Sequence, residues 1–207
     1  MTQLLRLTLI AAGMTAFLVL MLGSHLTQRA NGTEILLPVQ GYDPRDIFLG
    51  HYANLRTPLN RLGTHQLEGD DDFEAGDTIY VSLEPRADGT MAAVSLHREH
   101  PGGAYVARGG VTSRTELFGD WVNVEDPETG EVRTVREEAE GAWLSVRFNT
   151  ERYYAPRDRA LALQDRLRDR NEDGEIGVNI IAAITSDGGL IIKGLEYDGE
   201  RFEDSIW

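Results

Sequence analysis

Cysteine is absent from this chain of 207 residues. Its absence excludes disulfides, thiolate metal sites and cysteine nucleophiles, so stability must come from the packing of the core. Lysine is nearly absent as well, because Lys193 is the only lysine among 20 basic residues and the others are arginines. A hydrolase that uses a lysine as its general base would therefore have a single residue to choose from.

Positive charge is scarce relative to negative charge. The chain has 34 acidic residues against 20 basic ones, which gives a formal net charge of −14 at pH 7. Arg6 and Arg29 are the only charged residues before Ala30, so residues 30–207 carry a net charge of −16. Such a surface repels phosphate backbones and anionic headgroups. We therefore expect no nucleic-acid partner and no peripheral adhesion to lipid.

The sequence has one long hydrophobic run, residues 7–26, in which only His25 can carry a charge. As a helix, a run of about 20 residues spans about 30 Å, the thickness of a bilayer's hydrocarbon core. Arg6 precedes the run, and a strongly acidic domain follows Arg29, which favours a cytoplasmic N-terminus. We predict that residues 1–29 form a single-pass anchor in the inner membrane. Residues 30–207 are then an extracytoplasmic domain, in the periplasm or outside the cell.

Two alternatives to an uncleaved anchor are a cleaved signal peptide and a buried core helix. Signal peptidase requires small residues at positions −3 and −1 of the cut, and residues 22–24 and 28–30 supply them poorly. The length of the run argues against a core helix. The uncleaved anchor is the favoured interpretation.

Two hairpins are predicted from turn residues between apolar segments. Residues 77–84 and 91–97 flank a turn that contains Pro85 and Asp88-Gly89, and residues 178–185 and 190–197 flank Ser186-Asp187-Gly188-Gly189. Further strands are expected at residues 34–39, 104–112, 116–125, 132–135 and 142–149, and one helix at residues 157–170. This pattern predicts an α+β, mainly β fold, an antiparallel sandwich or barrel of about nine or ten strands with one covering helix.

A weak calcium pattern follows the predicted helix. Asp169, Asn171 and Asp173 have the D-x-N-x-D-G spacing of a calcium loop, with Gly174 at its sixth position. Position 12 is Ile180 instead of a bidentate glutamate, and a strand is expected where a second helix would follow. Calcium is the only cofactor that the sequence suggests, and an ordinary helix-to-strand turn is the alternative.

Catalytic signatures are lacking. His97 and Glu99 would lie on one face of a strand, in the arrangement of two zinc ligands, but the sequence offers no third ligand. Ser82 and Ser145 are expected on strands with nothing to activate them, and Lys193 has no serine in a suitable context. We predict no catalytic residue, and a membrane-anchored hydrolase is the weakest of the functional hypotheses.

Residues 47–57 read IFLGHYANLRT. This segment resembles the motif of the GDYXXLXY family of membrane-anchored bacterial proteins: Gly50, Tyr52 and Leu55 match three of its five positions, whereas His51 replaces Asp and Thr57 replaces the last Tyr. Residues 77–83 and 151–156 are similar to two further blocks of the family. The resemblance implies a single anchor and an extracytoplasmic domain, often accompanied by a multi-pass membrane protein of unknown function, and it implies no substrate.

In physical terms the motif is typical of a strand entrance. Gly50 permits close backbone approach, and Tyr52 and Leu55 are apolar anchors. Because they are three residues apart, a regular strand would place them on opposite faces, so we expect either a bulge or a strand covered on both sides. A packing role is favoured over a binding role. The sequence as a whole predicts an envelope-facing accessory or interaction domain, and the alternative is a calcium- or ligand-binding module.

Overall fold

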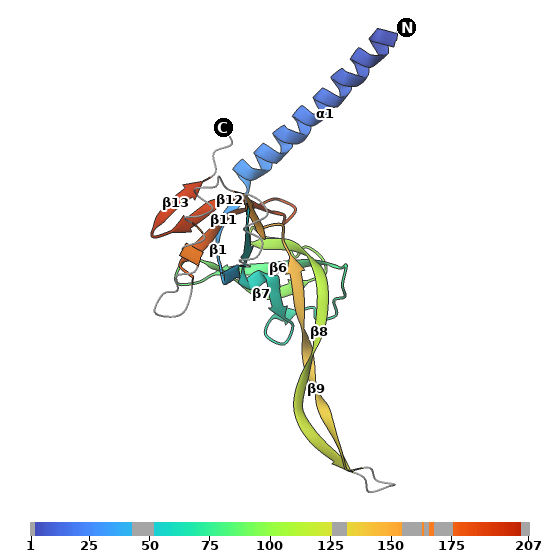
Figure 1. Ribbon diagram of the computed structural model, residues 1–207, viewed down its shortest axis with the longest axis vertical. Coiled ribbons are helices and arrows are strands. Elements are labelled where there is room, and N and C mark those ends of the chain that lie inside the picture. The colour runs from blue at the N-terminus through green and yellow to red at the C-terminus, as the bar shows by residue number, and fades with distance from the viewer. Residues whose placement is uncertain are drawn as a thin grey trace.

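The computed structural model describes residues 3–42, 52–125, 132–154, 163, 166–167 and 176–203. One long helix, α1 (Gln3–Asn31), leads away from a body of β-strands (Figure 1). The strands in this part of the chain are β1 (Thr33–Pro38), β2 (Gly41–Tyr42), β3 (Tyr52–Arg56), β4 (Arg61–Gly63), β5 (Glu68–Gly69), β6 (Thr78–Pro85), β7 (Met91–His97), β8 (Val106–Glu125), β9 (Val132–Arg147), β10 (Arg152–Tyr154), β11 (Val178–Ile184), β12 (Leu190–Tyr197) and β13 (Glu200–Glu203). A short 3₁₀ helix, η1 (Pro58–Asn60), joins β3 to β4.

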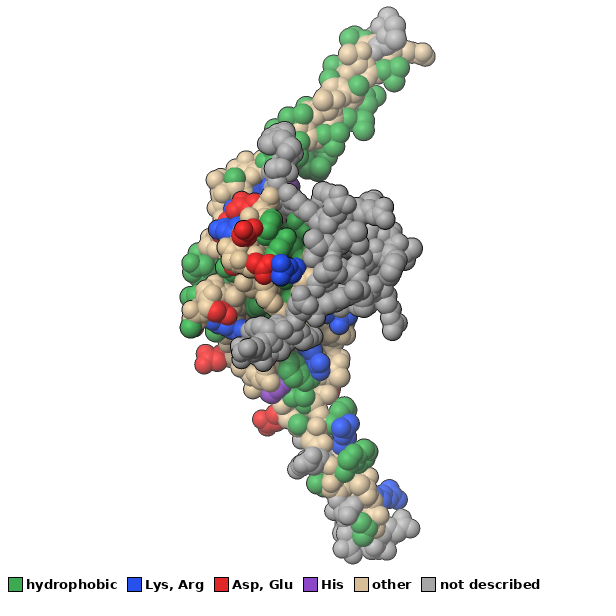
Figure 2. All heavy atoms as spheres, turned by 60° about the vertical axis from the view of Figure 1, so that its left-hand side comes forward, with side chains coloured by type: hydrophobic (Ala, Val, Ile, Leu, Met, Phe, Trp, Pro, Cys, Tyr) green, Lys and Arg blue, Asp and Glu red, His purple; other side chains and the backbone are tan. Residues whose placement is uncertain are grey.

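The expected N-terminal apolar helix is confirmed. Its segment Leu5–Asn31 is long and apolar enough to cross a membrane, and none of its most apolar stretch is buried by the rest of the chain. Large side chains along it stand well exposed, Phe17 by 66% and Leu20 by 72%. Figure 2 shows hydrophobic side chains along the length of the helix. The helix ends at Asn31, two residues beyond the predicted boundary, and β1 begins at Thr33.

The predicted fold class is also confirmed: the body is mainly β, with a curled sheet resembling a half-barrel and further antiparallel sheets. The strand orders are β1-β11-β12-β13, β10-β3-β2 and β4-β9-β8-β6-β7-β5. Among the described strands only β5 and β7 pair in parallel, over two residues each. One apolar core lies within this body, and it includes Leu163 and Leu167. Both are helical and four residues apart, as expected of the covering helix, of which the structure describes Leu163, Arg166 and Leu167.

Both predicted hairpins are present, as β6–β7 and β11–β12. The first turn forms because Asp88 Oδ1 accepts hydrogen bonds from Thr90 N at 2.9 Å and Thr90 Oγ1 at 2.8 Å. The next residue, Gly89, has φ +82°, a conformation that is strained in a residue with a side chain. The Asp-Gly pair therefore specifies this turn locally.

Two long strands replace four of the predicted ones. Residues 104–112 and 116–125 were expected to be separate, as were 132–135 and 142–149, but β8 and β9 run continuously. Three register shifts, the first between Val111 and Ser113, let the pairing continue past irregular positions. Residues 118–125 and 132–138 pair only with each other, and we name them the β8–β9 arm. The arm projects from the side of the body opposite α1 (Figure 1).

Candidate functional site

The family motif lies in β3, the central strand of the β10-β3-β2 sheet. Leu55 is 1% exposed and belongs to the core, whereas the next residue, Arg56, is exposed. Tyr52 pairs with Tyr154 of β10 through the backbone, and the register of β3 with its two neighbours is regular over residues 52–56. A bulge therefore does not explain the three-residue spacing of the motif. Gly50 lies outside the described residues.

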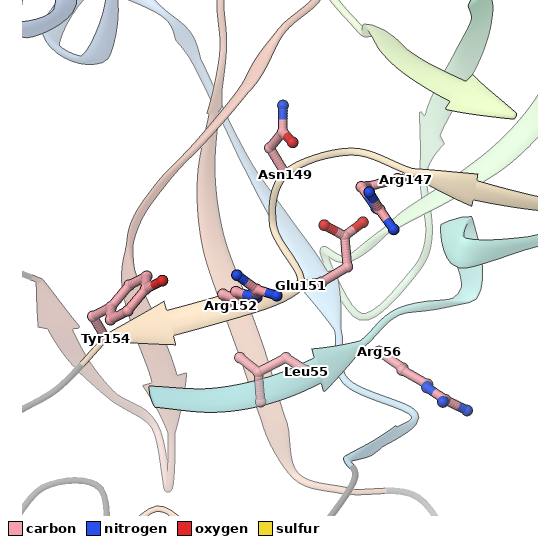
Figure 3. Close-up of a pocket in the computed structure, with 7 residues that line it drawn as sticks. All are labelled: Leu55, Arg56, Arg147, Asn149, Glu151, Arg152 and Tyr154. Atoms are coloured by element: carbon pink, nitrogen blue, oxygen red, sulfur yellow. The ribbon is translucent and has the colours of Figure 1, made fainter. Parts of the chain in front are cut away.

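The pairing of β3 with β10 places residues 52–54 beside residues 152–154, and these belong to two of the family-like blocks. A cavity of about 570 Å³ opens where these strands meet the end of β9 (Figure 3). Its described lining consists of Leu55, Arg56, Arg147, Asn149, Glu151, Arg152 and Tyr154. The motif strand thus supplies both a core residue and a cavity wall.

Glu151 organises this region. Its Oε1 accepts hydrogen bonds from Phe148 N at 2.7 Å and from Asn60 Nδ2 at 2.9 Å, which ties the turn after β9 to η1. Asn60 in turn accepts from Thr57 N at 2.8 Å. Asn149, inside the turn, has φ +64°, a conformation that asparagine tolerates better than most residues. The cavity therefore has a framework held by polar contacts.

Two further cavities adjoin the first through shared residues. One of about 600 Å³ shares Arg56, Arg147 and Glu151 with it, and another of about 450 Å³ shares Arg147 and Asn149. Six arginines line the three cavities: Arg56, Arg61, Arg98, Arg108, Arg147 and Arg152. Among the described lining residues Glu151 is the only acidic one. Arg98 is ion-paired with Asp77 and Arg108 with Asp187, but the lining still carries more positive than negative charge in a chain whose net charge is −14. The sequence did not predict this excess, because five of these arginines come from five different strands and Arg98 from the segment after β7.

The predicted metal sites have different outcomes. Asp169, Asn171 and Asp173 lie outside the described residues, so the calcium hypothesis stays a prediction. Elsewhere, within the described ranges, no group of three His, Cys, Asp or Glu side chains is placed to hold a metal ion. β7 ends at His97, so Glu99 does not continue the strand face on which the zinc hypothesis depended.

His97 instead contacts two serines. Its Nε2 lies 2.8 Å from Ser95 Oγ and 3.1 Å from Ser82 Oγ. The sequence offered no partner for Ser82, and the β6–β7 pairing supplies one. Among the described residues no carboxylate hydrogen-bonds to the His97 ring, as the third group of a catalytic triad would.

Lys193 is held in an ion pair. Its Nζ lies 2.5 Å from Glu34 Oε2, and Arg201 Nη2 lies 2.5 Å from Glu34 Oε1. The hydrogen bond from Lys193, followed by that from Arg201, lowers the pKa of the Glu34 carboxyl. The lysine therefore links β12 to β1 across the intervening strand β11, and no serine among the described residues is hydrogen-bonded to it.

These observations define a β-rich domain behind one apolar helix that could anchor it in a membrane, with an arginine-lined cleft next to its motif strand. The sequence model of the GDYXXLXY protein family matches residues 14–195, and the chain belongs to this family. The matched range includes the motif strand, the cavities and the β8–β9 arm. No curated protein and no solved structure matches the chain.

Proposed function

We propose that the chain is a membrane-anchored, envelope-facing accessory domain that works with a multi-pass membrane protein. The observation that carries this proposal is the complete exposure of the apolar stretch of α1. Large apolar side chains exposed over several turns require a non-aqueous environment, which a bilayer and neighbouring membrane helices provide. In this proposal α1 crosses the inner membrane once, and the β body lies in the periplasm or outside the cell.

α1 also has a face suited to a neighbouring membrane helix. Thr8, Ala12 and Ala16 recur at every fourth residue and so lie along one side. Small side chains at this spacing let the backbones of two membrane helices approach closely. This face supports contact with a partner that has transmembrane helices of its own.

The β8–β9 arm supplies a second surface for an interaction role. Phe118 is 56% and Trp121 is 67% exposed, and the guanidinium of Arg136 lies over both rings, at 5.3 Å and 5.5 Å from their centroids. Aromatic and arginine side chains dominate the binding energy of protein interfaces. Hydrophobic side chains mark both α1 and the arm on the surface (Figure 2). Since the arm is at the far end of the body from α1, it would meet the extramembrane part of a partner.

Copurification tests the proposal. The full chain is extracted from its native membrane in mild detergent, and the proteins that remain bound are identified by mass spectrometry. We expect a stoichiometric multi-pass membrane protein, and we expect the double variant Ala12→Leu, Ala16→Leu to lose it. Met21→Leu, on the opposite side of α1 from Ala12, is the matched control. Recovery of the chain alone from wild-type membranes would contradict the proposal.

Orientation can be tested because the chain has no cysteine of its own. Ala87 is exposed in the β6–β7 turn, and Gln3 is exposed at the start of α1. An impermeant maleimide should label Ala87→Cys in spheroplasts and should label Gln3→Cys only after lysis. The reverse pattern would place the β body in the cytoplasm. Loss of the Gln3→Cys peptide from the mature chain would show that the segment is a cleaved signal peptide.

A calcium-binding module is the second hypothesis, carried by the spacing of Asp169, Asn171 and Asp173. If it is correct, millimolar CaCl₂ raises the thermal midpoint of the full chain, because a ligand that binds only the folded state stabilises it. The variant Asp169→Asn, Asp173→Asn should abolish that rise. Equal midpoints with CaCl₂ and with MgCl₂ would remove the hypothesis.

A further inference from the structure

We propose that the cavity between β3, β4 and β9 binds a small, multiply charged oxyanion through Arg56, Arg61 and Arg147. This cavity, of about 600 Å³, is the arginine cleft; its other described lining residues are Gln40, Thr57, Asn60, Thr112, Ser145, Val146 and Glu151. Its volume is within the range of small-molecule sites. The inference goes beyond the accessory role, because it assigns a ligand class to a different part of the molecule.

Strand register explains why two of the arginines share a face. Burial alternates along β9, with Leu144 and Val146 in the core and Ser145 and Arg147 on the other side. Arg61 of β4 pairs directly with Ser145. Arg61, Ser145 and Arg147 therefore lie on one face of the sheet, and Arg147 is diagonal to Arg61. Arg56 reaches the same cavity from β3.

The three guanidiniums have no carboxylate partner in the part of the chain that the structure describes. Other arginines of the same body do: Arg108 lies 2.7 Å from Asp187, and Arg166 lies 2.7 Å from Asp198. A chain with 34 acidic residues could pair every arginine, yet this cleft gathers three that have no carboxylate partner among the described residues. Gathering like charges is unfavourable, and a bound anion would relieve the repulsion.

Arg61 is also held in a fixed orientation. Its guanidinium stacks over the ring of Trp143 at 4.5 Å from the centroid, and Trp143 makes an edge contact with His65 at 5.2 Å. Stacking uses the face of the guanidinium and leaves its N–H edge free to donate. That edge matches the two oxygens of a carboxylate or phosphate, which arginine binds through paired hydrogen bonds.

Glu151 is the one acidic residue of the cleft within the described lining. Its Oε1 is occupied by Phe148 N and Asn60 Nδ2, so this carboxylate is committed to the framework. Three arginines and one glutamate leave the cleft with a positive charge. The combination of unpaired guanidiniums, a preset Arg61 and a cavity of ligand size points to an oxyanion.

Calorimetry on the full chain in phosphatidylcholine nanodiscs tests the inference, with inorganic pyrophosphate and citrate as the probes. We expect at least one probe to bind, and we expect Arg61→Gln and Arg147→Gln each to weaken it by about tenfold. Arg147→Lys, which keeps the charge, should lose less. Arg86→Gln is the matched control, because Arg86 is exposed and lines none of the three cavities. Thermal midpoints show that each variant is folded.

The source of the anion is distinguished by repeating the titration in nanodiscs that contain phosphatidylglycerol. If lipid headgroups occupy the cleft, those nanodiscs weaken the binding of the soluble probe; if the ligand is a free anion, the affinity stays the same. Both outcomes require the oxyanion site. Absence of binding of both probes at millimolar concentration, or equal affinity in the wild type and Arg147→Gln, overturns it. Neither of these results depends on whether a partner copurifies.

Discussion

Arg29 Nη2, near the end of α1, donates a hydrogen bond of 2.9 Å to the carbonyl of Lys193 in β12. Lys193 is the residue skipped by the β11–β12 register, which pairs Ile181 with Gly194 and then Ala182 with Ile192. The same residue reaches Glu34 of β1 with its ammonium group. One bulged lysine therefore connects the apolar helix, the first strand and the C-terminal hairpin.

Arg29→Ala should loosen the junction between helix and body. The amide of Gly32 donates to Gln28 O at 3.0 Å. We expect its hydrogen exchange to accelerate by about tenfold when the hydrogen bond from Arg29 to Lys193 O is removed. Hydrogen-exchange mass spectrometry of the full chain in detergent measures this. Arg6→Ala, near the other end of α1, is the control and should leave the exchange unchanged. Equal rates in Arg29→Ala and wild type would show that the bond contributes nothing to the junction.

Glu34 predicts an acid-sensitive component of stability. Its pKa is lowered in the folded state, first by the hydrogen bond from Lys193, so folding favours the ionised carboxylate. The resulting stabilisation is fully present above the ordinary pKa of 4.5 and is lost as pH falls through the lowered folded value. At neutral pH Glu34→Gln should be less stable than the wild type by up to about 1 kcal/mol, which lowers its thermal midpoint. The two midpoints should converge in acid. A gap that stays constant down to the acid limit would refute this.

Leu55 tests the packing role of the family motif. Leu55→Ala should lower the free energy of unfolding by about 2–5 kcal/mol, because the side chain is 1% exposed and its removal leaves a cavity in the core. Denaturant unfolding followed by tryptophan fluorescence measures the loss. The neighbouring exposed residue provides the control, and Arg56→Ala should change stability by less than about 0.5 kcal/mol. If both variants were equally stable, the motif would owe nothing to packing at this position.

Phe118 and Trp121 of the arm should affect partner binding and leave stability almost unchanged. Phe118→Ala and Trp121→Ala remove exposed side chains, so each should change the free energy of unfolding by less than about 0.5 kcal/mol. If the arm contacts the partner, both variants should reduce the copurified protein by tenfold or more, on the order of a hot-spot loss. Tyr105→Ala is the control, since Tyr105 is 45% exposed but lies outside the arm. Undiminished recovery of the partner would remove the arm from the interaction.

Local signals in the sequence predicted the parts of the fold that local chemistry determines. The β6–β7 hairpin follows from Asp88 and Gly89, which set the turn through contacts only two residues apart in the chain. The continuous strands β8 and β9 were not predicted, because the irregular positions within them resemble the ends of shorter strands. In the structure those positions are register shifts, which only the partner strand reveals. Pairing between residues far apart in the sequence therefore determines that β8 and β9 are continuous strands.

The arginine cleft could not be predicted for a similar reason. Arg56, Arg61 and Arg147 belong to three strands, and only the β4–β9 register brings Arg61 beside Ser145 and Arg147. In the sequence each is one arginine among nineteen, and the overall negative charge pointed away from anion binding. Net charge describes the whole surface and cannot show where unpaired positive groups gather.

The junction after α1 leaves no linker between the helix and the sheet. Gly32 packs so closely on β11 that an added Cβ would lie 2.8 Å from Ile184 O and 2.9 Å from Ala183 Cβ. β1 starts at the next residue, so the body must follow the helix when the helix moves. A change in the tilt of α1 then becomes a larger sweep of the β8–β9 arm, which projects at the opposite end (Figure 1). The molecule has the geometry of a lever whose pivot is the junction between α1 and β1.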